Sequence, residues 1–89
     1  FRLGKLNYLQ GRYEESIVCY TEATRLAPDF VDAYFERGVS HFLLRQTHEA
    51  VTDYSKVIEI DPAYIKAYLK RAAIYEKWGE EYKAKAIED

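Results

Sequence analysis

The chain has 89 residues, 48% of them hydrophobic and 31% charged, with a net charge of −2. This composition is typical of a globular domain, and it excludes the strong basic excess of a nucleic-acid-binding surface. No apolar run reaches the length of about 18 residues that crosses a membrane. The single cysteine, Cys19, excludes an internal disulfide and agrees with a reducing, cytoplasmic location.

The sequence repeats itself with a period of 34 residues. When the chain is shifted by one period, identical residues coincide without a gap to about residue 84. Among these pairs are Phe1 and Phe35, Gly4 and Gly38, Leu9 and Leu43, Glu15 and Glu49, Tyr20 and Tyr54, Pro28 and Pro62, Ala33 and Ala67, Tyr34 and Tyr68, and Arg37 and Arg71. Such regular self-similarity indicates a repeat architecture.

Each period is predicted to form two helices. The first unit, residues 1–30, is expected to contain helices near 1–9 and 14–26, with Gly11 at the bend. In the second unit, residues 31–64, apolar residues recur at helical spacing from Ala33 to Phe42. The pattern breaks at residues 44–47, where Thr47 is predicted to be the N-cap of the next helix.

The second helix of this unit is predicted to end before Asp61-Pro62, since proline cannot continue a helix. The third unit, residues 65–89, is expected to contain helices near 65–77 and 81–89, with a bend at Gly79. Two alignments of this unit remain open: one uses Ala84 as its small residue, and the other uses Ala86 and implies a two-residue insertion.

The second bend departs from the pattern, because Arg45 and Gln46 stand where a glycine is expected. A residue other than glycine is strained in the left-handed conformation, so this turn is predicted to be strained or altered. His41, which occupies the usual place of a tyrosine, is predicted to be a partly buried core residue.

The pattern resembles the tetratricopeptide repeat (TPR) family, in which an aromatic, a small residue, a second aromatic, alanine, an aromatic and proline follow at fixed spacing. In the second unit the matching residues are Tyr34, Gly38, His41, Ala50, Tyr54 and Pro62. The resemblance covers the whole chain and implies an all-α fold, with tandem antiparallel helix hairpins stacked into a right-handed superhelical α-solenoid. The chain is then expected to be a fragment of about two and a half repeats from a larger protein, with self-association through its truncated ends.

In this family the first helix of each hairpin lines a concave groove. The resemblance therefore implies that the exposed face of these helices binds a peptide segment or a partner helix. The expected groove residues are Lys5, Tyr8, Phe35, Glu36, Val39, Phe42, Lys66, Leu69 and Lys70. Exposed contiguous apolar surface of this kind marks a binding site, and aromatic side chains are favoured anchors.

Some family members hold the terminal carboxylate of a chaperone tail in a clamp of Lys, Asn and Arg. Lys66 and Lys70 match the third-repeat half of that clamp, with Lys70 in place of Arg. Glu36 stands where the clamp has Asn, and Phe1 and Lys5 stand where it has Lys and Asn. Because Glu36 would repel a carboxylate, this clamp is disfavoured.

Catalysis is not expected, because no nucleophile–base set, metal-ligand spacing or phosphate-binding loop is present. The sequence therefore predicts a protein-interaction module in a scaffold or a co-chaperone-like protein, without a cofactor or metal and without nucleic acid or membrane as partner. The alternative is a structural spacer or oligomerisation segment that has no peptide ligand of its own.

Overall fold

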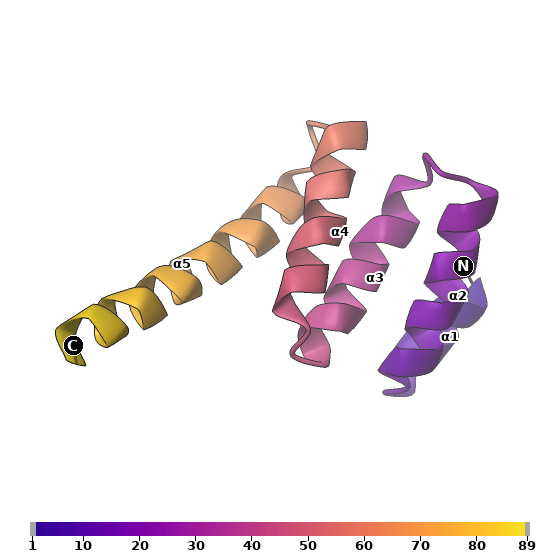
Figure 1. Ribbon diagram of the computed structural model, residues 1–89. Helices are drawn as coiled ribbons and strands as arrows, with labels where there is room; N and C mark the ends of the chain where they lie inside the picture. The colour runs from indigo at the N-terminus through magenta and orange to yellow at the C-terminus, as the bar shows by residue number, and fades with distance from the viewer. Residues whose placement is uncertain (1, 89) are drawn as a thin grey trace.

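The chain folds into five helices, and no strand occurs among residues 2–88. The computed structural model describes the backbone of these residues and the side chains of residues 3–79. The helices are α1 (Arg2–Leu9), α2 (Tyr13–Leu26), α3 (Val31–Leu43), α4 (Thr47–Ile60) and α5 (Ile65–Glu88). Figure 1 shows α1 to α4 packed side by side, each against the next, with α5 extending away from them. The predicted all-α solenoid of stacked hairpins is confirmed.

Two glycines allow the helices of each hairpin to approach closely. A Cβ atom added at Gly4 would lie 2.7 Å from the ring of Tyr20, and one added at Gly38 would lie 2.7 Å from the ring of Tyr54. Both rings are almost fully buried. The two contacts are separated by one period of 34 residues, so the sequence repeat corresponds to a repeated helix–helix contact.

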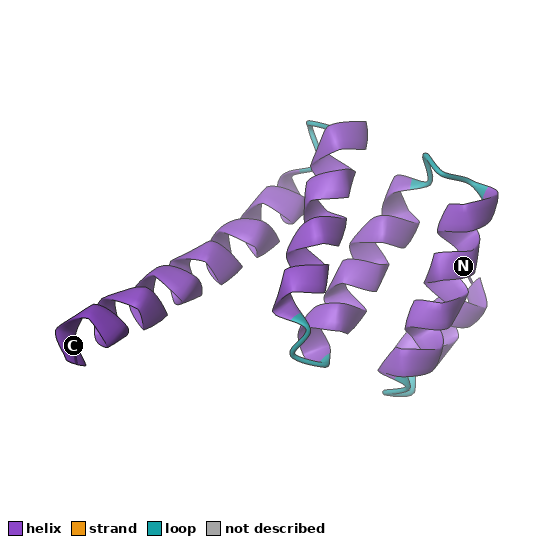
Figure 2. Cartoon of the chain, viewed as in Figure 1, coloured by secondary structure: helices purple, strands orange, loops and turns teal. Residues whose placement is uncertain are grey.

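Short turns connect the helices (Figure 2). At the end of α1 the amide of Arg12 donates to the carbonyl of Asn7 at 2.8 Å, and at the end of α3 the amide of Gln46 donates to the carbonyl of His41 at 2.8 Å. These bonds to the fifth preceding residue are typical of a left-handed helix C-cap. Gly11 takes this conformation with φ 75°, and Arg45 takes it with φ 63°.

The second turn is therefore not altered by the lack of a glycine. It has the geometry of the first turn, and the cost falls on the backbone of Arg45. For a residue with a Cβ atom this conformation costs about 1–2 kcal/mol. Of the two outcomes predicted from the sequence, strain is the one that the structure shows.

Arg45→Gly is expected to raise the free energy of unfolding by about 1 kcal/mol, because glycine adopts this conformation without steric cost. Urea denaturation followed by circular dichroism would measure the change. Gly11→Ala is the matched control, since an added Cβ atom there meets nothing within 4 Å and would introduce only the backbone strain. It should lower the stability by a similar amount, and a destabilised Arg45→Gly variant would contradict the argument.

The start of α4 differs from the prediction. Thr47 is the first residue of the helix and not its N-cap; Gln46 precedes the helix and makes no side-chain capping hydrogen bond. The amide of Ala50 instead bonds to the carbonyl of Gln46 at 3.0 Å. The side chain of Thr47 is thus free to line a cavity, which is described below.

The bend predicted at Gly79 is wrong. Helix α5 runs through Gly79 to Glu88, so the separate helix expected near 81–89 does not form. Glycine lowers helix stability by only about 1 kcal/mol and does not by itself end a helix. The open question of which alanine aligns with Ala50 lies outside the described side chains.

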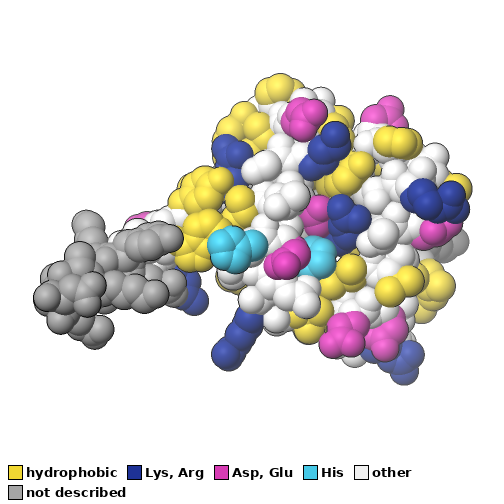
Figure 3. All heavy atoms as spheres, in the orientation of Figure 1, with side chains coloured by type: hydrophobic (Ala, Val, Ile, Leu, Met, Phe, Trp, Pro, Cys, Tyr) yellow, Lys and Arg dark blue, Asp and Glu magenta, His cyan; other side chains and the backbone are white. Residues whose placement is uncertain are grey.

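Hydrophobic side chains remain exposed on α5, and Figure 3 shows such side chains gathered over its first half. The most exposed are Ile65, Leu69 and Tyr75. On this helix Ala72 occupies the position of Gly4 and Gly38. Ala72 is exposed, whereas both glycines are covered by the helix that follows them.

Candidate peptide-binding groove

Charged side chains of α1, α3 and α5 act on Glu36. This residue lies on the middle helix, α3, and is partly buried. Burial raises the pKa of its carboxyl group, while Lys5 on α1 and Lys66 on α5 act in the opposite direction and Asp32 adds to the rise. Lys5, Glu36 and Lys66 thus lie on α1, α3 and α5, the three helices that the sequence predicts to line the groove.

An aromatic pair lies at the α1 end of this groove. The ring of Tyr8 is 5.7 Å from that of Tyr13, at the start of α2. Burial, with smaller contributions from Glu36, Tyr8 and Cys19, raises the pKa of the neighbouring Tyr20 to about 12. Tyr8 is itself only partly buried, so it offers both ring surface and a hydroxyl group to a ligand.

Apolar side chains continue along the groove helices. Val39 on α3 is half-buried and packs against the core, whereas Phe42 near the end of the same helix is 43% exposed. Leu69 on α5 is 65% exposed, and Lys70 follows it. Phe42 and Lys70 line the same cavity, whereas Leu69 does not.

Phe35 is not on the exposed face that the sequence predicted for it. Its side chain is only 6% exposed, and its ring lies 5.1 Å from that of Tyr64 and 5.7 Å from that of Tyr54. The ring fills the space between α3, α4 and the start of α5. Its role as an exposed anchor is therefore corrected to a role in the core.

A cavity of about 280 Å³ opens between the end of α3, the start of α4 and the middle of α5. It is lined by Phe42, Thr47, Tyr54, Lys70, Ala73, Ile74, Lys77 and Trp78. Four of these side chains are aromatic or branched apolar groups, and two are lysines. No acidic side chain of the described part of the chain is among them.

Sequence reasoning placed Phe42 and Lys70 in the groove but missed the cavity residues Thr47, Ile74 and Trp78. A comparison of equivalent positions could have found them. One period earlier, Tyr13 stands in place of Thr47 and Val39 in place of Ala73. Thr47 and Ala73 are smaller than Tyr13 and Val39. They leave room at the cavity, whereas the equivalent place one period earlier holds the Tyr8–Tyr13 pair.

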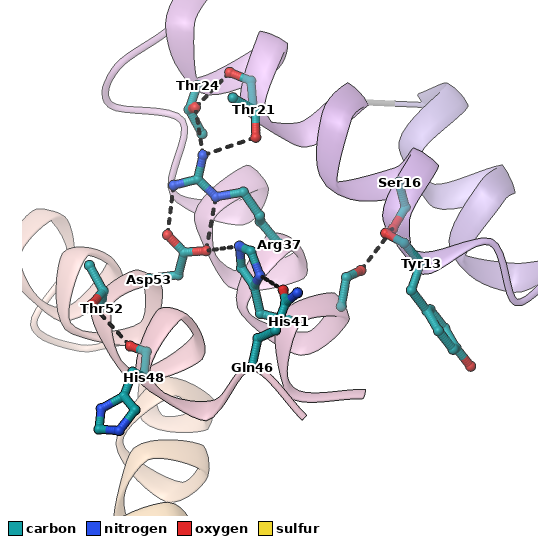
Figure 4. A network of polar contacts seen from close by, with 11 residues as sticks. Tyr13, Ser16, Thr21, Thr24, Arg37, His41, Gln46, His48, Thr52 and Asp53 are labelled. Atoms are coloured by element: carbon teal, nitrogen blue, oxygen red, sulfur yellow. Dashed lines mark hydrogen bonds and ion pairs between the residues drawn. The ribbon is translucent and has the colours of Figure 1, made fainter. Parts of the chain in front are cut away.

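A second polar cluster joins α2, α3 and α4 and is shown in Figure 4. Arg37 on α3 donates from Nη2 to Oδ1 of Asp53 at 2.6 Å and from Nε to Oδ2 at 2.9 Å. Its Nη1 donates to the hydroxyl groups of Thr21 at 3.3 Å and Thr24 at 3.4 Å. The hydrogen bond to Asp53 raises the pKa of the Arg37 guanidinium.

His41 belongs to the same cluster, with its Nε2 atom 3.7 Å from Oδ2 of Asp53 and its Nδ1 atom 2.7 Å from Oε1 of Gln46. It is partly buried, as the sequence predicted. Asp53 is 3% exposed and satisfied by these neighbours. A buried carboxylate already paired with an arginine is a structural element rather than a catalytic one.

Among the described residues, no three His, Cys, Asp or Glu side chains gather into a group that could hold a metal ion. None of the helices in this part of the chain is both long and apolar enough to cross a membrane.

Stacked helix hairpins that repeat with one period define a helical-repeat protein of the interaction class. The family model for the TPR repeat matches residues 4–44 and 46–79. The chain therefore belongs to the tetratricopeptide repeat family, a protein-interaction module whose members are typically not enzymes.

Solved structures agree with this assignment. The crystal structure of MamA is 28% identical with a TM-score of 0.85, and the match covers 97% of this chain and 53% of MamA. The first TPR of Spaghetti (RPAP3), bound to the HSP90 peptide SRMEEVD, is 27% identical with a TM-score of 0.82, covering 96% of this chain and 69% of that one. The first TPR domain of human RPAP3, at 22% identity and a TM-score of 0.56, shares the fold. No curated protein matches.

Proposed function

We propose that this chain binds an extended or helical peptide segment of a partner protein in the groove formed by α1, α3 and α5. The supporting observation is that Lys5 on α1 and Lys66 on α5 both act against the rise in the pKa of Glu36 on α3, so charges of the three helices influence one another. These three polar side chains could orient a ligand, while Val39, Phe42 and Leu69 provide apolar contact area. The module would then act in the cytoplasm, within a scaffold or a co-chaperone-like protein.

The RPAP3 repeat domain provides a comparison, because it is bound to the HSP90 peptide SRMEEVD, which contains three acidic residues. In this chain Glu36 would oppose a terminal carboxylate placed between Lys5 and Lys66. We therefore propose that the peptide does not need a free C-terminal carboxylate next to Glu36.

Peptides selected from a random display library on the wild-type chain would test the function. We expect the double variant Lys66→Glu/Leu69→Ala to weaken the selected peptides at least about tenfold, since it reverses a charge and removes an apolar contact. Fluorescence anisotropy would give the dissociation constants, and circular dichroism would confirm that the variant is folded.

The control is Lys56→Glu on α4, which reverses the charge of a lysine outside the helices predicted to line the groove. It should bind the selected peptides as the wild type does. If Lys56→Glu abolished binding and the groove variant did not, the groove would not be the binding site. If no peptide were selected, the alternative of a spacer or oligomerisation segment would replace this proposal.

A further inference from the structure

The two halves of the groove differ in the space that they offer. At the α1 end, Tyr8 and Tyr13 place two rings 5.7 Å apart. At the α5 end the equivalent residues, one period later, are Phe42 and Thr47. A threonine in place of the second tyrosine leaves a volume that no ring fills, and the cavity of about 280 Å³ lies there.

The size of this cavity suits one side chain. Sites for whole small molecules usually have volumes of about 300–1,000 Å³, and this cavity is just below that range. Its walls include Phe42, Tyr54, Ile74 and Trp78. Ile74 and Tyr54 are buried, and the ring of Trp78 is fixed 4.7 Å from that of His48 and 5.8 Å from that of Tyr75. A large apolar side chain would find an already formed apolar surface here.

The charges at the two ends of the groove also differ. Lys70 and Lys77 line the cavity, and the equivalent residues one period earlier are Glu36 and Leu43. Both lysines are exposed, and neither forms an ion pair with another side chain among residues 3–79. The cavity is thus an apolar pocket with a positively charged rim, whereas Lys5 and Lys66 share the groove with an acidic side chain.

We propose that this cavity binds one large apolar side chain of a partner peptide whose neighbouring residues are acidic, and that it does so within a chain segment rather than at a free C-terminus. The inference rests on the proposed peptide-binding function and specifies the ligand of the same groove. The apolar side chain would lie against Phe42, Ile74 and Trp78, and the carboxylates on either side of it would lie near Lys70 and Lys77.

The probe is a short peptide, acetylated and amidated, with one central phenylalanine between glutamates. Trp78 is the only tryptophan of the chain, so its fluorescence reports directly on the cavity. We expect binding to change this fluorescence. Replacing the phenylalanine by alanine should weaken binding about tenfold or more, since the burial of a large apolar side chain in the cavity is lost. Replacing the glutamates by lysines should abolish it.

Two variants convert the cavity into its counterpart at the α1 end. Thr47→Tyr fills it with the residue of the earlier position, and Lys70→Glu gives it the charge of that position. We expect Thr47→Tyr to remove the preference for phenylalanine over alanine, and Lys70→Glu to weaken both peptides. Thr52→Tyr is the control for Thr47→Tyr, because it adds the same ring at an exposed site of α4 that does not line this cavity.

The outcomes separate this inference from the proposed function. The first outcome is that library-selected peptides bind and depend on Lys66, while the phenylalanine probe binds no more tightly than its alanine version or keeps its affinity for the Thr47→Tyr variant. The groove then binds peptides, but the cavity assignment is overturned. A free carboxylate that strengthens the probe tenfold over the amide would overturn the internal-segment assignment. If neither the probe nor any selected peptide binds the folded chain, both proposals are wrong.

Discussion

Asp53→Ala is expected to lower the free energy of unfolding by about 3–5 kcal/mol, because it leaves a partly buried arginine without its partner. The carboxylate of Asp53 receives two hydrogen bonds from Arg37 and lies 3.7 Å from His41. Domains of this size are typically stable by only about 5–10 kcal/mol, so most of the stability is at risk. Urea denaturation followed by circular dichroism would measure the loss.

Two comparisons isolate the cause of this effect. Glu22→Ala removes an exposed ion pair with Arg25 and should leave stability unchanged. The double variant Arg37→Leu/Asp53→Leu removes both charges and should lose less stability than Asp53→Ala alone, since no unpaired charge remains. If the double variant were the less stable of the two, the unpaired arginine would not be the cause.

Phe35→Ala is the second change with a large expected effect, also about 3–5 kcal/mol of destabilisation. The ring is buried and contacts Tyr54 and Tyr64, so its removal leaves a cavity at the centre of the core. Thermal and urea denaturation would measure it. The result separates a core role from the binding role that its place on a groove helix suggested.

Phe42→Ala is the matched comparison, because Phe42 lies on the same helix and is 43% exposed. It should cost less than about 1 kcal/mol of stability and should weaken the phenylalanine probe. A Phe35→Ala variant as stable as Phe42→Ala would contradict the assignment of Phe35 to the core.

The hairpin architecture could be predicted from the sequence because its determinants are local and occur twice. Each proline lies just after the end of a helix. Each close contact between the two helices of a hairpin requires a small residue, and these small residues are one period apart. Gly4 and Gly38, which lie one period apart, both stand at such contacts. The repeat also predicted the partial burial of His41, since its position in the period is a core position.

The candidate site was only partly predictable. Helical spacing placed Lys5, Glu36 and Lys66 on the helices predicted to line the groove, and the role of these residues in binding stays a prediction. The same spacing placed Phe35 on the exposed face as well. A period of about 3.6 residues indicates a face of the helix but not how far the neighbouring helix extends over it.

The sequence by itself determined the fold, because the repeat, the turn residues and the apolar stripes all specify the same hairpin. Only the tertiary structure decided which groove residues are accessible and where the groove has a cavity. These properties depend on side chains from segments far apart along the chain, such as Tyr64 covering Phe35 and Trp78 approaching His48. The path of the chain at Gly79 was decided in the same way, since a single glycine is compatible with either a bend or a continuous helix.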